Sequence, residues 1–162
     1  MNTKTKVYSV IAIVICLALV YYIFTLAAQN SQNCATAPAA EIDVGGDQNV
    51  VYHIHPQLNI NINGEDVVIP TNIGLTSGIM RPLHTHDTTG EIHVESPCER
   101  DFVLGDFFDL WGKTFTSTCI LDSCVDENHT LTMYVNGIES TEYRDLILKD
   151  KNEIEIIYEE TV

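Results

Sequence analysis

The feature that most constrains this chain is an uncharged apolar stretch near its amino end. Residues 7–28 read VYSVIAIVICLALVYYIFTLAA and contain no charged side chain. Because a helix rises about 1.5 Å per residue, a stretch of this length can cross a hydrocarbon core of about 30 Å. It is longer than the apolar part of a cleaved signal peptide, and no clear cleavage site follows it. We therefore expect an uncleaved transmembrane anchor over residues 7–28.

The charges around this stretch predict its orientation. Lys4 and Lys6 precede it, and no basic residue follows it closely. By the positive-inside rule, residues 1–6 form a cytoplasmic amino terminus and the rest lies outside, which predicts a single-pass protein of the cell membrane. Residues 29–48 are small and polar and include proline and glycine, so we expect a flexible tether. Residues 49–162 then form one extracytoplasmic domain.

Acidic residues dominate the part of the chain beyond the apolar stretch. All 23 acidic residues lie there, together with six of the eight lysines and arginines. Such a surface repels the phosphates of nucleic acids and of anionic lipids, so no nucleic-acid partner is expected. Solubility in a salty or acidic exterior is an equally simple explanation of the acidic surface.

Cysteine usage agrees with an oxidising exterior. Cys16 lies in the apolar stretch, where a thiol acts as a small apolar side chain. Four cysteines remain, an even number that allows three disulfide connectivities. We favour Cys119 with Cys124, which closes a short loop, and Cys34 with Cys98. A thiolate metal site is the rival interpretation, but the chain lacks any CxxC pair.

One further motif agrees with an exterior location. Asn128-His129-Thr130 is the only N-glycosylation sequon in the chain. We predict glycosylation at Asn128, although such tripeptides also arise by chance.

The outer domain opens with the alternating pattern of half-buried strands. His53 and His55 fall on the polar side of the first such segment. Asn63-Gly64 is a strong hairpin signal, and the following VVIP is expected to return as the partner strand. EIHVE predicts a later strand with His93 again on the polar face.

The second half of the domain adds a helix and further strands. Apolar residues recur at helical spacing and predict a short amphipathic helix at Leu104, Phe107, Phe108 and Trp111. Asn136-Gly137 predicts another hairpin, and NEIEIIYEE a closing strand. We therefore expect an α+β fold with a single antiparallel or mixed sheet and one short helix, preceded by the transmembrane helix; a β-grasp-like order is one topology that fits.

Five of the six histidines fall within YHIHPQL and PLHTHDTTGEIHVE. Neutral imidazole is a ligand that suits copper and zinc, and a site needs three or four such groups. Residues at i and i+2 on a strand point the same way, so His53 with His55, and His84 with His86, each offer two ligands. His93 can join them only if its strand lies beside the first. The sequence thus predicts a copper or zinc site.

Nearby carboxylates can support these histidines. Asp87, Glu91 and Glu95 can bind the ion directly or hold an imidazole through its other ring nitrogen. The alternative is that the histidines line a polar sheet face without any metal. No catalytic residue is predicted, because HTHDTTGE fits only half of a cupin pattern and no serine or cysteine nucleophile has a recognisable context.

Four segments together resemble a known family: HIHPQLNININGEDVVIP, LHTHDTTGEIHVESP, DFVLGDFFDLWG and VNG. They are similar to an uncharacterised family of small membrane-anchored extracytoplasmic domains found in archaea, including ammonia oxidisers, and in some bacteria. The similarity covers about residues 50–158. It implies no activity, but it implies an outer location and a common role for His53, His55, His84, His86 and His93.

These observations support three hypotheses of function. The leading one is a membrane-tethered, extracytoplasmic module that binds copper or zinc for storage, delivery or sensing, near a membrane oxidase or another membrane complex. The second is an accessory or structural subunit of a membrane complex with no metal. The third is a metal-dependent enzyme with an open coordination position, although the sequence favours a role without catalysis.

Overall fold

The computed structural model describes the backbone of residues 3–161, with side chains except those at 3–7, 10, 27–33 and 47. The chain divides into two compact units after Thr36, and each is described by itself. The first unit holds one helix, α1 (Thr3–Thr36).

The described part of the chain corrects one prediction. No helix made of described residues is long and apolar enough to cross a membrane. The transmembrane helix predicted over residues 7–28 is therefore not supported.

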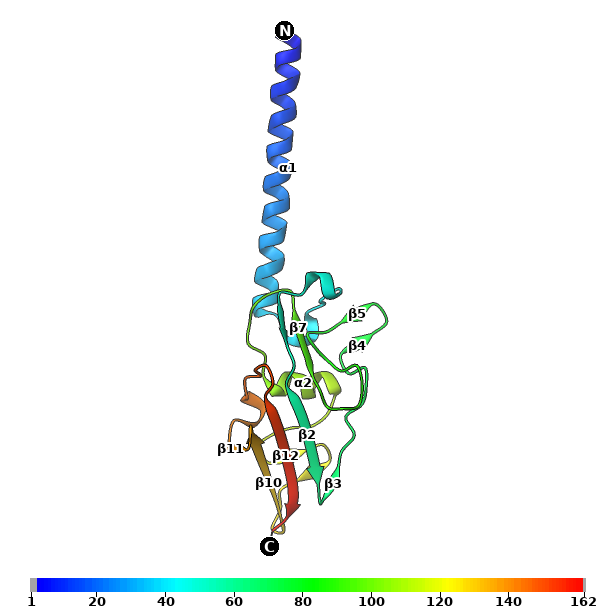
Figure 1. Ribbon diagram of the computed structural model, residues 1–162. Coiled ribbons are helices and arrows are strands. Elements are labelled where there is room, and N and C mark those ends of the chain that lie inside the picture. Colours follow the sequence, from blue (N-terminus) through cyan, green and yellow to red (C-terminus); the bar gives the residue numbers. More distant parts are fainter. Residues whose placement is uncertain (1–2, 162) are drawn as a thin grey trace. The chain divides into compact units, whose positions relative to one another are not determined.

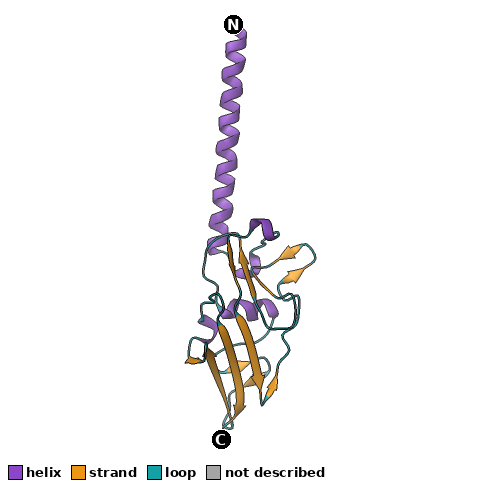
Figure 2. Ribbon diagram, viewed as in Figure 1, coloured by secondary structure: helices purple, strands orange, loops and turns teal. Residues whose placement is uncertain are grey.

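The second unit is an α+β structure (Figures 1 and 2). Its helices are α2 (Leu104–Trp111) and three short 3-10 helices, η1 (Ala39–Glu41), η2 (Asp47–Asn49) and η3 (Tyr143–Asp145). Its strands are β1 (Tyr52–Ile54), β2 (Gln57–Ile62), β3 (Glu65–Asp66), β4 (Leu75–Thr76), β5 (Ile79–Met80), β6 (Leu83–His84), β7 (His93–Ser96), β8 (Cys119–Ile120), β9 (Ser123–Cys124), β10 (His129–Val135), β11 (Ile138–Ser140) and β12 (Glu153–Glu160).

The largest sheet has five strands in the order β11-β10-β12-β2-β3. β12 pairs parallel with β2 and antiparallel with β10, and Figure 1 shows these three strands side by side. Alternate residues of the paired strands are buried, among them Leu58 and Ile60 of β2 and Ile154 and Ile156 of β12. The alternating pattern predicted from the sequence therefore places one face of this sheet in the core.

The prediction of a single sheet, β-grasp-like or otherwise, is wrong. The described residues form three further sheets, β1-β7-β6, β4-β5 and β8-β9. Pro56 is buried between β1 and β2, and because proline lacks an amide hydrogen it cannot donate to a continuous ladder. β1 therefore pairs with β7, while β2 joins β12.

The turn signals are confirmed, but one partner strand is not. Asn63-Gly64 and Asn136-Gly137 both have positive φ at the two central residues of a tight hairpin. VVIP was expected to follow the first hairpin as a strand, yet β3 ends at Asp66. A single backbone bond from the Val67 amide to the Ile60 carbonyl, 2.9 Å long, continues the pairing.

The amphipathic helix is confirmed as α2. Leu104, Phe107 and Phe108 are fully buried, and Gly112 ends the helix in the left-handed conformation with φ 69°. α2 packs against η1, η3 and β6. The helix thus supports one strand of the small sheet from the core side.

The four cysteines beyond the apolar stretch are oxidised as predicted. Cys119 and Cys124 form a disulfide across the β8-β9 hairpin. Cys34 and Cys98 are disulfide-bonded as well. Cys16 is the free cysteine of the described residues.

Candidate metal centre

Strand pairing in the small sheet brings histidines from three strands to one face. β7 lies between β1 and β6. His53 lies opposite Glu95, and His84 lies opposite His93. Because His93 and Glu95 are two residues apart on β7, their side chains point to the same face. All four side chains therefore share that face.

The other two histidines extend this arrangement beyond the strand ends. His55 and His86 follow β1 and β6, two residues after His53 and His84. The ring centroid of His93 lies 4.6 Å from that of His55 and 4.5 Å from that of His86. The condition set by the sequence, that the strand of His93 lies beside the first strand, is met.

The five imidazoles form two groups of three that share His93. In one group the ligand atoms of His53, His55 and His93 all lie within 4.8 Å of one another, and in the other the same holds for His84, His86 and His93. A Zn–N bond is about 2.0–2.1 Å, so two nitrogens on one ion are at most about 4 Å apart. Side-chain shifts of about 1 Å therefore close either group on an ion. These histidine clusters can hold a metal ion.

His84 is the most enclosed of these ligands. Its side chain is 0% exposed, and its Nδ1 lies 3.0 Å from the carbonyl oxygen of Arg81. A carbonyl only accepts hydrogen bonds, so Nδ1 carries the proton and Nε2 of the neutral ring keeps its lone pair. That Nε2 is buried and has no hydrogen-bond partner. Such an unsatisfied nitrogen is costly in a protein interior unless an ion completes it.

Burial also keeps the central imidazoles neutral. Burial lowers the pKa of His84 from 6.5 to about 4, against the opposing effect of the Arg81 carbonyl. The pKa of His93 is lowered too, chiefly by burial and then by its histidine neighbours His86 and His55. A metal needs the neutral ring, so both side chains are ready to bind at neutral pH.

Two of the three predicted carboxylates contact the cluster. Glu95 is buried, and its Oε1 lies 3.0 Å from Nε2 of His53 and 3.7 Å from Nδ1 of His93. Glu91 is exposed, with Oε1 3.2 Å from Nε2 of His93. Oε2 of Glu95 is buried without a hydrogen-bond partner. Either carboxylate can orient an imidazole or add an oxygen ligand.

The third predicted carboxylate, Asp87, is hydrogen-bonded within its own loop. Its Oδ1 accepts hydrogen bonds from the backbone amide and the hydroxyl of Thr89. These two bonds lower the pKa of its carboxyl group. Asp87 therefore shapes the loop that follows His86.

Sequence reasoning missed the backbone contacts that hold His84 in place. Gly74 has φ +70°, and a Cβ there would lie 2.2 Å from the Leu83 carbonyl oxygen and 3.1 Å from Cβ of His84. Only glycine fits such a close approach at positive φ. Gly74 also accepts, through its carbonyl, a 2.9 Å bond from the Arg81 amide. The sequence marked Gly74 only as part of a loop.

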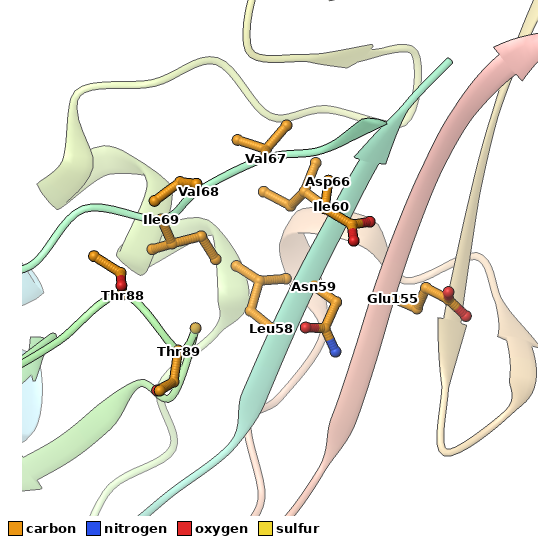
Figure 3. A pocket seen from close by; sticks show the side chains of 11 residues that line it. Leu58, Asn59, Ile60, Asp66, Val67, Val68, Ile69, Thr88, Thr89 and Glu155 are labelled. Atoms are coloured by element: carbon orange, nitrogen blue, oxygen red, sulfur yellow. The ribbon is translucent and has the colours of Figure 1, made fainter. Parts of the chain in front are cut away.

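A second glycine ties the histidine loop to the large sheet. The carbonyl of Gly90 accepts a 2.9 Å bond from the Leu58 amide, and a Cβ on Gly90 would lie 2.2 Å from the Leu58 carbonyl. Figure 3 shows Thr88 and Thr89 beside Leu58, at a groove of about 410 Å³. None of the five clustered histidines lines this groove. The loop that follows His86 therefore lies directly against β2.

His129 lies outside the cluster. Its Nδ1 contacts Oδ1 of Asp126 at 2.8 Å, and its ring stacks on Tyr158 with centroids 5.0 Å apart. The neighbouring Asn128 is exposed, so its glycosylation stays a prediction. His129 serves as an internal reference for a histidine with a structural role.

Fold and site together define a small α+β protein with a five-histidine cluster on a three-stranded sheet. Comparisons with protein-family models, curated proteins and solved structures find no match. The family resemblance described from the sequence stays a prediction.

Proposed function

We propose that this protein binds a transition metal, copper or zinc, through its clustered histidines. The observation that carries the proposal is the buried, unpartnered Nε2 of His84, a residue that forms a three-histidine group with His86 and His93. A histidine with a purely structural role is expected to satisfy a buried nitrogen with a protein partner. Here the partner at Nδ1 fixes the ring and leaves Nε2 buried without a partner.

The donor set favours copper or zinc over magnesium or calcium. Imidazole nitrogen suits zinc, copper, iron and nickel, whereas magnesium and calcium prefer oxygen ligands. Nitrogens outnumber carboxylates in each group, since Glu91 and Glu95 are the only acids in contact with His53 or His93 in the described cluster.

The work proposed for the metal is storage, delivery or sensing outside the cytoplasm. The oxidised cysteines support an extracytoplasmic compartment, where disulfides persist. Histidines at the solvent-facing side of the cluster support exchange with a partner, because the side chain of His53 is 48% exposed. Both features fit a protein that takes up an ion and releases it again.

Metal analysis of the purified full-length chain tests the proposal. After treatment with a chelator and addition of copper or zinc, we expect at least one tightly held ion per chain. Changing both His84 and His86 to alanine should remove tight binding, while His129→Ala should retain it. An unmodified chain that holds no ion, with a fold and melting temperature unchanged by added metal, would leave only the structural role.

A further inference from the structure

The two histidine groups come from opposite edges of one small sheet. His53 and His55 belong to the β1 edge, and His84 and His86 to the β6 edge, with His93 on β7 between them. Neighbouring strands are about 4.8 Å apart, so β1 and β6 are separated by about 10 Å. His53 and His84 therefore lie at opposite edges of the sheet, with their side chains on the same face.

One ion is too small to gather all five imidazoles. Nitrogens bound to the same ion lie within about 4 Å of each other. Among the described residues, the groups whose ligand atoms all lie within 4.8 Å of one another contain three histidines each, and His93 is their common member. Close ring contacts likewise connect His93 to both edges, whereas none joins the β1 edge directly to the β6 edge in the described cluster.

We infer that the cluster holds two metal ions, one in each group, with the imidazole of His93 as the bridge between them. This inference rests on the proposed function and adds the number of ions and their connection. A histidine ring offers two nitrogens, so each can bind a different ion. Neither nitrogen of His93 is taken up by a backbone group: Nδ1 is buried without a hydrogen-bond partner, and Nε2 lies 3.2 Å from Oε1 of exposed Glu91.

The bridge requires one proton to leave. A neutral imidazole has one N–H and one lone pair, so the first ion takes the lone pair of His93. The second ion replaces the remaining N–H proton, which is released to solvent, and His93 becomes an imidazolate. The negative charge of that ring, with Glu91 and Glu95 nearby, offsets the charge of two dications.

The β1 edge gives its ion a route to solvent. A groove of about 650 Å³ is lined by His55, Glu91, Glu153 and Glu155, with Lys151 as its one basic side chain. Three carboxylates attract cations toward this edge. The ion of the β6 edge instead lies against buried His84. The two positions therefore differ in access although they share a ligand.

A copper titration of the full-length, chelator-treated chain tests the inference, with Cu²⁺ alone as the probe. We expect two ions per chain and the release of one extra proton with the second. An imidazolate bridge couples two Cu²⁺ ions antiferromagnetically. The electron paramagnetic resonance signal should therefore grow with the first equivalent and fall with the second, well below one spin per copper.

Two other results would contradict different claims. One ion per chain, or two ions with a full spin for each copper, would refute the bridged pair while leaving metal binding intact. No bound copper and no bound zinc would refute the proposed function together with the pair. The number of bound ions therefore distinguishes failure of the bridged pair from failure of the proposed metal-binding function.

A matched pair of variants checks the assignment to His93. His93→Gln keeps a polar side chain but cannot bridge, so any copper that remains bound should show a full spin per ion and no extra proton release. His129→Gln changes a histidine that contacts Asp126 away from the cluster and should behave as the unmodified chain does. A coupled signal that survives in folded His93→Gln protein would show that His93 is not the bridge. If that variant does not fold, proton release and spin count in the unmodified chain still decide.

Discussion

The two edges of the histidine cluster share a sheet, a face and one ligand, yet they differ in their surroundings. At the β6 edge, His84 is fully buried and its ring is fixed by the Arg81 carbonyl. At the β1 edge, the side chain of His53 is 48% exposed and is held by the carboxylate of Glu95. The difference teaches that identical side chains can be buried and fixed at one edge of a small sheet and exposed to solvent at the other.

The largest expected effect is the loss of affinity when a ligand of the buried edge is removed. His84→Ala should weaken metal binding by at least about 100-fold, because removing even an orienting partner of a ligand costs about 10–100-fold. His53→Ala should leave one ion tightly bound, since the buried edge remains complete. Competition with a chromophoric chelator measures both. Equal losses in the two variants would abolish the distinction between the edges.

The pH dependence of folding stability should also reveal the burial of His84 at the β6 edge. The pKa of His84 is lowered by burial from 6.5 to about 4, so the unfolded chain takes up this proton first as the pH falls. The metal-free protein should lose at most about 3 kcal/mol of unfolding free energy through this group between about pH 6.5 and pH 4, with no further loss below. Stability is thus highest on the neutral side.

Denaturant unfolding of chelator-treated protein at several pH values measures this effect. His84→Gln should flatten the profile, because glutamine does not titrate. A profile that stays steep in His84→Gln would assign the effect to another group.

The close approach of Gly74 to the backbone at the buried edge predicts a smaller loss, of folding stability. Gly74→Ala should destabilise the protein by about 2 kcal/mol, because the new Cβ would meet the Leu83 carbonyl oxygen at 2.2 Å. Gly78→Ala is the matched control, since Gly78 also has positive φ but a Cβ added there would meet nothing within 4 Å. Thermal melts should show the larger decrease for Gly74→Ala. Equal decreases would mean that backbone strain alone is responsible.

The smallest effect on metal binding is expected from Glu95, the buried carboxylate that contacts exposed His53. Glu95→Gln should weaken the more exchangeable ion by about 10-fold and leave the tighter one unchanged, because the amide holds His53 less strongly than a carboxylate does. Two-site fits of metal titrations measure this. A change confined to the tighter ion would reverse the assignment of Glu95.

Local patterns allowed much of the fold to be predicted from the sequence. Asn-Gly turns, the helix at Phe107 and Phe108, and the closing strand β12 all depend on short-range preferences, and each is present. The division into several sheets depends on Pro56 and on which distant strands pair. Pairing between β1 and β7 joins residues about forty positions apart, and no local pattern encodes it.

The same distinction applies to the site. Histidine spacing indicated which rings point the same way, and this sufficed to select all five members. It did not indicate that His93 would be central, that the Arg81 carbonyl would fix His84, or that Gly74 would pack on its backbone. These contacts depend on the three-dimensional path of the loop between β3 and β6.

The buried proline between β1 and β2 has one more consequence. Gln57, the first residue of β2, forms a bridge with Glu91, and the Leu58 amide donates a 2.9 Å bond to the Gly90 carbonyl, so the segment before β7 connects the small sheet to the large one. An ion that ties β1, β7 and β6 together should slow amide hydrogen exchange in those strands while β10 and β12 keep their original rates. Metal binding would then change the rate of local opening in the small sheet and leave the large sheet unaffected.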